Sequence, residues 1–149
     1  MRIFSVTLGI IVLDQLSKLL VQEFMNQGQS IKILESFLYL TYLENPGAAF
    51  GILPYRTTLF ILVTIAVMVF IFYYLRKLPS HYRLMRLGLT FMLAGAAGNL
   101  IDRLRIGYVI DFINLNFWPP VFNVADVAIV IGIIVFVYSF WQKELVWQD

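Results

Sequence analysis

Residues 95–126 read GAAGNLIDRLRIGYVIDFINLNFWPPVFNVAD, and they gather polar side chains in an otherwise apolar chain. The segments on either side are long and apolar enough to be membrane-spanning helices. Acids, amides and an arginine next to hydrocarbon are costly and usually serve a function. The polar residues that this stretch offers as functional candidates are Asn99, Asp102, Arg103, Asp111, Asn123 and Asp126.

The composition indicates a membrane protein. The 149 residues are 60% hydrophobic and 13% charged, whereas a soluble domain is about 25% charged. The net charge of +2 is too small, and the basic residues are too clustered, to indicate a nucleic-acid partner. The whole chain, residues 1–149, is predicted to form one membrane-embedded domain.

The chain has no cysteine and a single histidine, His81. Disulfides, thiolate metal ligands and a cysteine nucleophile are therefore excluded. A Ser-His-Asp triad would need His81, which lies in a basic loop, and a histidine metal site normally needs more than one histidine. No metal and no cofactor are predicted, and the available chemistry narrows to carboxylates.

Four membrane-spanning helices are predicted, which gives an all-α polytopic membrane fold. The first helix resembles a signal peptide, but Asp14, Gln15 and Lys18 interrupt it and no cleavage site follows, so we expect it to be retained. In the third helix, Gly95 and Gly98 lie among alanines, which lets neighbouring helices pack closely. The predicted helices cover residues of about 3–24, 57–75, 87–103 and 121–141.

The loop between the second and third helices fixes the topology. Residues 76–86 hold four arginines and lysines and no acid. Short loops this basic face the cytoplasm. Both termini are then cytoplasmic, and residues 25–56 and 104–120 are extracytoplasmic.

The two extracytoplasmic segments differ in pattern. Residues 25–56 alternate aromatic and β-branched positions with polar ones, which predicts short strands at the membrane interface. They include NPGAAFG at 45–51, which is either a plain turn or a loop that binds a peptide through the Asn45 amide and the glycine N–H groups. Residues 104–120 are rich in aromatic side chains suited to a membrane surface, and two prolines interrupt regular structure before the fourth helix.

Two charged pairs have more than one interpretation. Asp14 and Lys18 are spaced i,i+4 and can pair on one helix face, which would orient the first helix within the bundle. The second interpretation is a direct catalytic role for Asp14. Arg103 can pair with its neighbour Asp102 or reach a substrate carbonyl, and the local pair is favoured for Asp102.

Asp111 and Asp126 are the best candidates for chemistry, because the topology puts both near the outer interface. Two carboxyl groups brought close in a medium of low dielectric cannot both ionise easily, so such a pair shares a proton. The ionised member can activate a water, and the protonated member can polarise the carbonyl under attack.

The acids of this region have two further interpretations. They could pair with Arg103 and Arg105 to hold the outer loop. As a transporter, the chain could instead pass a cation or a proton along Asp14, Asp102 and Asp126. The acids cluster towards one membrane face, which disfavours transport across the bilayer.

Five motifs follow one another along nearly the whole chain: DQLSK at 14–18, NPGAAFG at 45–51, AGAAGNLIDR at 94–103, VIDFI at 109–113 and FNVAD at 122–126. In this order and with four helices, they resemble the motifs of the lipoprotein signal peptidases, or signal peptidase II, a family of bacterial membrane aspartic peptidases. The resemblance implies an enzyme of the bacterial cytoplasmic membrane with its active site near the outer face. It implies that diacylglyceryl-modified prolipoproteins, membrane lipid and globomycin-type inhibitors are the partners.

The resemblance also implies roles for individual residues. Such enzymes remove the signal peptide just before the lipidated cysteine, and Asp111 and Asp126 match their catalytic dyad. The residues that match positions binding the substrate or globomycin are Asn45, Gly47, Asn99, Arg103 and Asn123. The residues expected to support the site are Asp14, Lys18 and Asp102. The family further implies a small extracytoplasmic β-like cradle after the first helix and a short interfacial lid helix in residues 104–120.

Overall fold

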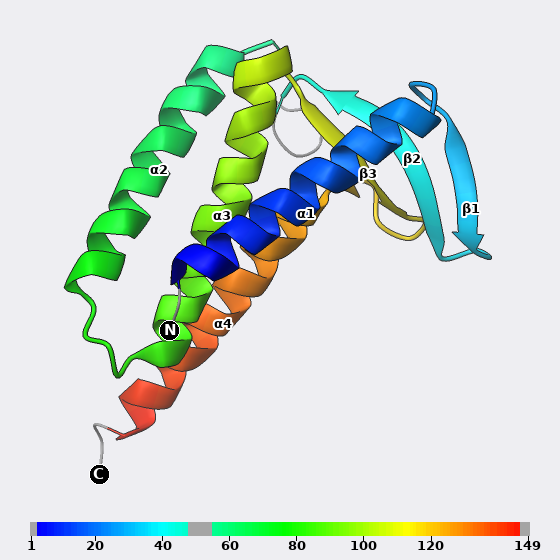
Figure 1. The fold of residues 1–149 in the computed structure, drawn as a ribbon. Coiled ribbons are helices and arrows are strands. Elements are labelled where there is room, and N and C mark those ends of the chain that lie inside the picture. Colours follow the sequence, from blue (N-terminus) through cyan, green and yellow to red (C-terminus); the bar gives the residue numbers. More distant parts are fainter. Residues whose placement is uncertain (1–2, 48–54, 147–149) are drawn as a thin grey trace.

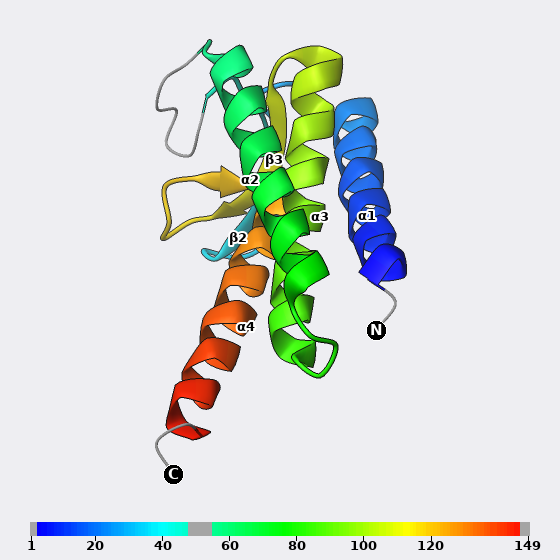
Figure 2. The same ribbon diagram turned by 90° about the vertical axis from the view of Figure 1, so that its left-hand side faces the viewer.

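The computed structural model describes residues 3–47 and 55–146, which form four helices and one small sheet (Figures 1 and 2). All four helices are long and apolar enough to cross a membrane, by length and composition. The prediction of four membrane-spanning helices is therefore confirmed. In chain order the elements are α1 (Ile3–Phe24), β1 (Ser30–Leu34), β2 (Leu38–Asn45), α2 (Thr57–Lys77), α3 (Arg83–Ile106), β3 (Val109–Leu115), β4 (Val121–Phe122) and α4 (Val124–Val146).

The bounds of α3 and α4 differ from the predicted ranges for local reasons. The helix α3 ends where Gly107 adopts a left-handed φ of 86° and donates its N–H to the carbonyl of Arg103, a conformation that glycine adopts without steric cost. The helix α4 begins at Val124 because Val121 and Phe122 are paired with β3.

The helix α3 is the centre of the bundle, since it packs against α1, α2 and α4 (Figure 1). Glycines let α3 and α4 approach closely. A Cβ atom built on Gly88 would lie 2.7 Å from the carbonyl oxygen of Gly132, and one built on Gly132 would lie 2.7 Å from that of Gly88. A Cβ on Gly95 would meet the carbonyl oxygen of Ala125. The close helix packing predicted at the small residues of α3 is therefore found against α4.

Gly95→Ala is expected to lower the free energy of unfolding by about 1–3 kcal/mol, the usual cost of forcing extra atoms into a packed contact. The clash is with the backbone of Ala125, which cannot move without moving α4. Thermal unfolding in detergent measures the effect. Gly9→Ala is the matched control, because a Cβ at Gly9 meets no atom within 4 Å. Equal melting temperatures for the two variants would contradict the prediction.

The four strands form one antiparallel sheet in the order β1-β2-β3-β4. It lies at the opposite end of the bundle from the start of α1, the end of α4 and the connection between α2 and α3 (Figures 1 and 2). Val21 and Met25 pack with Tyr42, Ile110 and Phe112 to join the end of α1 to the sheet. The strands predicted within residues 25–56 are confirmed, and this sheet corresponds to the expected cradle.

The predicted lid helix is wrong for the described residues, because no helix lies between α3 and α4. The linker instead forms β3, a turn and β4. The backbone of β3 pairs with β2 over most of its length, with Leu43 opposite Asp111 and Asn45 opposite Val109. The segment Val109–Leu115 thus continues the sheet rather than forming a helix.

Candidate active site

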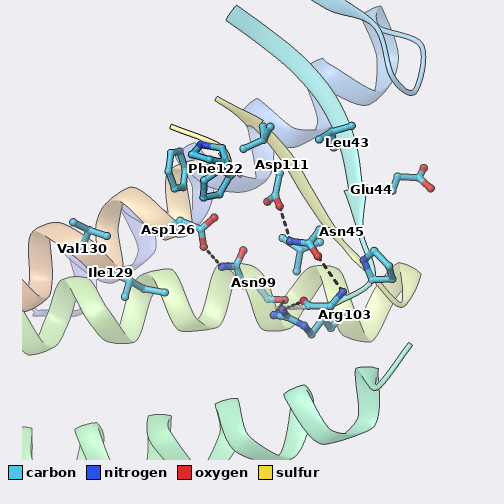
Figure 3. Close-up of a pocket in the computed structure, with 16 residues that line it drawn as sticks. Leu43, Glu44, Asn45, Asn99, Arg103, Asp111, Phe122, Asp126, Ile129 and Val130 are labelled. Carbon is cyan, nitrogen blue, oxygen red and sulfur yellow. Dashed lines mark hydrogen bonds between the residues drawn. The ribbon is translucent and has the colours of Figure 1, made fainter. Parts of the chain in front are cut away.

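A cavity of about 670 Å³ lies where the sheet meets α3 and α4 (Figure 3). One wall is polar and is built from β2, β3 and the outer ends of the two helices. The apolar wall adjoins Asp126 and includes Phe122, Ile129 and Val130 (Figure 3). The site residues predicted from the sequence that line the cavity are Asn45, Gly47, Asn99, Arg103, Asp111 and Asp126.

Asp126 lies in the first turn of α4, and Asn123 directly precedes that helix. The backbone N–H of Asp126 donates to Asn123 Oδ1 over 2.9 Å, and the backbone N–H of Asn123 donates to Asp126 Oδ2 over 3.2 Å. This reciprocal pair is a capping box. The other carboxyl oxygen, Asp126 Oδ1, accepts a hydrogen bond of 2.7 Å from Asn99 Nδ2 (Figure 3). The local sequence N-x-x-D therefore holds the Asp126 carboxyl group at the helix N-terminus, where the helix dipole favours negative charge.

Asp111 lies in the middle of β3 and is only 4% exposed. Its Oδ1 accepts a hydrogen bond of 2.7 Å from Asn123 Nδ2, and its Oδ2 accepts one of 2.9 Å from Asn45 Nδ2. Burial, and secondly the charge of Asp126, raise the pKa of Asp111 to about 7, although the bonds from Asn45 and Asn123 oppose the shift. Asp111 can therefore exchange a proton near neutral pH.

Asn123 connects the two carboxyl groups. Its side chain donates to Asp111 and its backbone N–H donates to Asp126. Asn123 itself is fully buried and does not line the cavity. The structure thus brings Asp111 and Asp126 together on one wall, as the topology predicts.

Asn45 closes the turn after β2 and also bonds Asp111. Its Oδ1 accepts a hydrogen bond of 3.0 Å from the Gly47 N–H, while its Nδ2 bonds Asp111. The guanidinium of Arg103 donates to the Gly47 carbonyl over 3.1 Å and lies 5.2 Å from the ring centre of Phe60. The remaining part of NPGAAFG, residues 48–51, lies outside the described residues.

The prediction that Asp102 pairs with Arg103 is wrong. Asp102 Oδ2 lies 2.8 Å from Lys18 Nζ and accepts a bond from the Ile110 N–H. Asp102 turns away from the cavity and towards α1, whereas Arg103 faces the cavity. Successive residues of a helix point about 100° apart, so these neighbours serve different faces of α3.

The predicted pair of Asp14 and Lys18 is confirmed, at 2.9 Å between Oδ2 and Nζ. Both side chains are buried between helices, and neither lines the cavity. Asp14 Oδ1 accepts the backbone N–H of Ala125 over 2.8 Å, so α1 caps the N-terminus of α4. Gln15, which in the sequence only interrupts the first apolar segment, donates to Asp14 and Asp102.

Arg103 and Arg105 do not hold the outer loop through ion pairs with the acids. Within the described ranges, no aspartate forms a salt bridge with either arginine. Arg105 instead donates to Gln15 Oε1 over 3.3 Å. Among the residues that the structure describes, no three acids or histidines are grouped so that they could hold a metal ion.

The apolar wall of the cavity was not predicted from the sequence. Ile129 and Val130 follow Asp126 at i+3 and i+4, which is the spacing that places side chains on one helix face. The position of Asp126 in the fourth helix was therefore the signal that could have identified these two residues as part of the site.

The fold and the cavity define a membrane-embedded enzyme with a carboxyl-lined site. A solved structure described as a bacterial membrane enzyme shares this fold with a TM-score of 0.90 and 32% identity, over 95% of this chain and 88% of that chain. The family model described as Signal peptidase (SPase) II matches residues 6–142. The chain belongs to the signal peptidase II family, and it is a protease.

Two relatives agree with this assignment. The lipoprotein signal peptidase of Moorella thermoacetica is 46% identical over 145 residues, which cover 97% of this chain and 94% of the relative. That of Halothermothrix orenii is 44% identical over 144 residues, which cover 97% and 98%. The hypothesis of a small proton- or cation-coupled transporter finds no support in these comparisons.

Proposed function

We propose that this peptidase removes the signal peptide from diacylglyceryl-modified prolipoproteins, and that Asp111 and Asp126 are its catalytic dyad. The cut falls just before the lipidated cysteine. The observation that carries the proposal is that Asn123 bonds both carboxyl groups at the wall of one cavity. The names of the relatives supply the class of substrate.

In this mechanism the dyad shares one proton. Asp126 accepts hydrogen bonds from Asn99 and from the Asn123 N–H, which suits an ionised carboxylate. Asp111, with its pKa raised to about 7 by burial and by the charge of Asp126, carries the proton. Asp126 takes a proton from a water whose oxygen bonds the scissile carbonyl carbon, and Asp111 donates a hydrogen bond to the carbonyl oxygen. The C–N bond then breaks, and the leaving nitrogen takes a proton from the dyad.

The membrane orientation that we propose follows from the basic connection between α2 and α3. Arg76, Lys77, Arg83 and Arg86 lie at this end of the bundle, and the sheet and the cavity lie at the other (Figure 1). Short basic loops stay in the cytoplasm. We therefore assign both termini to the cytoplasm of a bacterial cell and the active site to the outer face of its cytoplasmic membrane, where a lipid-anchored substrate arrives from the bilayer.

The cavity offers two kinds of surface for such a substrate. Arg103 and Asn45 present donors for the backbone of an extended peptide. The wall of Phe122, Ile129 and Val130 suits acyl chains or an apolar peptide. A globomycin-type inhibitor is proposed to bind in the same cavity.

A single assay tests the proposal. Purified protein in detergent, with no membrane gradient, is incubated with a diacylated precursor, with the same precursor lacking the diacylglyceryl group, and with globomycin. We expect cleavage of the lipidated precursor only, and its inhibition by globomycin. Equal cleavage of both precursors, or no cleavage of either, would overturn the substrate assignment.

The dyad mechanism predicts that kcat falls as the pH rises through about 7. The active form needs a proton on Asp111, and that form is present below the pKa and lost above it. Above pH 7 we expect a loss of about tenfold per pH unit. In Asn45→Ala, a hydrogen bond that lowers the pKa of Asp111 is lost. The fall should then move to higher pH, and an unmoved profile would contradict the role given to Asp111.

Arg103→Ala is expected to raise KM by about tenfold or more, because a charged donor that reaches the cavity is worth about 1.5–3 kcal/mol. Steady-state cleavage of the diacylated precursor measures this. Arg105→Ala is the matched control, since Arg105 is on the same helix and does not line the cavity. Equal KM values for the two variants would rule out a substrate-facing Arg103.

A further inference from the structure

Lys18 is an unusual residue in this bundle. It is 1% exposed and lies within α1, a helix that spans the membrane. Its ammonium has three partners: Asp14 Oδ2 at 2.9 Å, Asp102 Oδ2 at 2.8 Å and Asn99 Oδ1 at 3.1 Å. The two carboxylates compensate the buried charge. The contact with Asn99 is not needed for that purpose, and it connects Lys18 to the cavity.

The contacts of Asn99 show what this connection does. Its Oδ1 accepts hydrogen bonds from Lys18 Nζ and from Asn123 Nδ2, the latter at 3.1 Å. An ammonium can only donate, so the atom that faces Lys18 must be the carbonyl oxygen. The amide nitrogen of Asn99 then necessarily faces Asp126 Oδ1, to which it donates over 2.7 Å.

The side-chain amide of Asn123 also has a fixed orientation, and it reaches the second acid, Asp111. Its Oδ1 accepts the Asp126 N–H, so its Nδ2 is the atom that donates to Asn99 and Asp111. Each of these two side-chain amides therefore directs an N–H group at a carboxyl group. Lys18 is the first donor in this series of hydrogen bonds, because its ammonium can only donate.

We propose that Lys18 is a positioning residue, which fixes the orientation of the Asn99 amide and thereby holds the Asp126 carboxylate by an N–H donor. The proposal deepens the proposed function and rests on it. Lys18 itself touches neither the cavity nor the reacting atoms. A charge-assisted bond to Asn99 Oδ1 also polarises the amide, which strengthens the bond that its Nδ2 makes to Asp126.

The test must separate positioning from the stability of a buried charge cluster. Removing Lys18 alone leaves two buried carboxylates unpaired, which is strongly destabilising. Both test proteins therefore carry Asp14→Asn and Asp102→Asn. One has Lys18→Gln and the other Lys18→Met. Their clusters are equally neutral, and they differ in whether residue 18 has an N–H donor for Asn99.

We expect the protein with Lys18→Met to lose at least tenfold in kcat relative to the protein with Lys18→Gln, with KM values within threefold. Equal kcat values would overturn the proposal and leave Lys18 a structural residue. Gln15→Leu is the control for the cluster, since Gln15 bonds Asp14 and Asp102 without touching Asn99. It should lower the melting temperature and leave kcat within threefold of the wild type.

A cycle with Asn99→Ala, in which Lys18→Leu replaces Lys18→Met, keeps the test decisive if the Lys18→Met protein does not fold. If residue 18 acts through Asn99, the Lys18→Leu protein loses kcat relative to the Lys18→Gln protein, and the two proteins have equal kcat values in the Asn99→Ala background. Equal losses in both backgrounds would overturn the proposal. Asp126→Asn is assayed in parallel: if that variant keeps its activity, it is the proposed dyad that fails, whatever residue 18 does.

Discussion

Asp126→Asn and Asp111→Asn are each expected to lower kcat by at least about a thousandfold, as loss of a proton-transferring residue does in other hydrolases. An amide has nearly the shape of the carboxyl group, yet it can neither take a proton from water nor exchange one with its partner. In Asp126→Asn the amide oxygen can still accept from Asn99 or from the Asn123 N–H, so the fold is retained.

The measurement is single-turnover cleavage of a diacylated precursor, with thermal unfolding as the check on folding. Glu35→Gln is the control, because Glu35 is an exposed acid that pairs with Lys32 and does not line the cavity. It should cleave at the wild-type rate. A folded Asp111→Asn or Asp126→Asn protein that still processes the precursor at about a tenth of the wild-type rate or more would refute the dyad.

Asn123→Ala is expected to lower kcat by about a hundredfold, because it removes the side chain that donates to the Asp111 carboxyl group and accepts the backbone N–H of Asp126. The Asp111 carboxyl group loses one of its two donors, and α4 loses its cap. Loss of the cap alone costs about 1 kcal/mol. Since Asn123 does not line the cavity, KM should change by less than threefold.

Asn116→Ala provides the matched control for this second variant. Asn116 is in the same linker region, and its side chain bonds the Ser36 carbonyl, away from the cavity. It should keep its kcat. If Asn123→Ala lowered stability but not kcat, the capping role would stand and the positioning of the acids by Asn123 would not.

The helices of this fold were predictable because a span of hydrocarbon demands a long apolar segment whatever its partners. β1 and β2 were predictable from their alternation. β3 was missed because Val109–Leu115 does not alternate between apolar and polar residues, and because the family resemblance implied a helix in residues 104–120. The pairing with β2 decides the conformation.

The site was predictable where one element sets it and not where distant elements meet. Asp111 and Asp126 follow from topology, since the helix ends place them at one depth. Asp102 was predicted to pair with Arg103 because a sequence alone shows only which residues are neighbours along the chain. Its partner Lys18 lies on another helix, and only the packing of α1 on α3 brings the two together.

The bond from the Ala125 N–H to Asp14 has a consequence for the assembly of the site. It joins residues 111 positions apart, and it links α1 to α4. Until α4 packs beside α1, Asp14 has no N–H of Ala125 to accept. In the proposed mechanism, the two carboxyl groups of the dyad are therefore expected to reach their working positions only after both helices are in place.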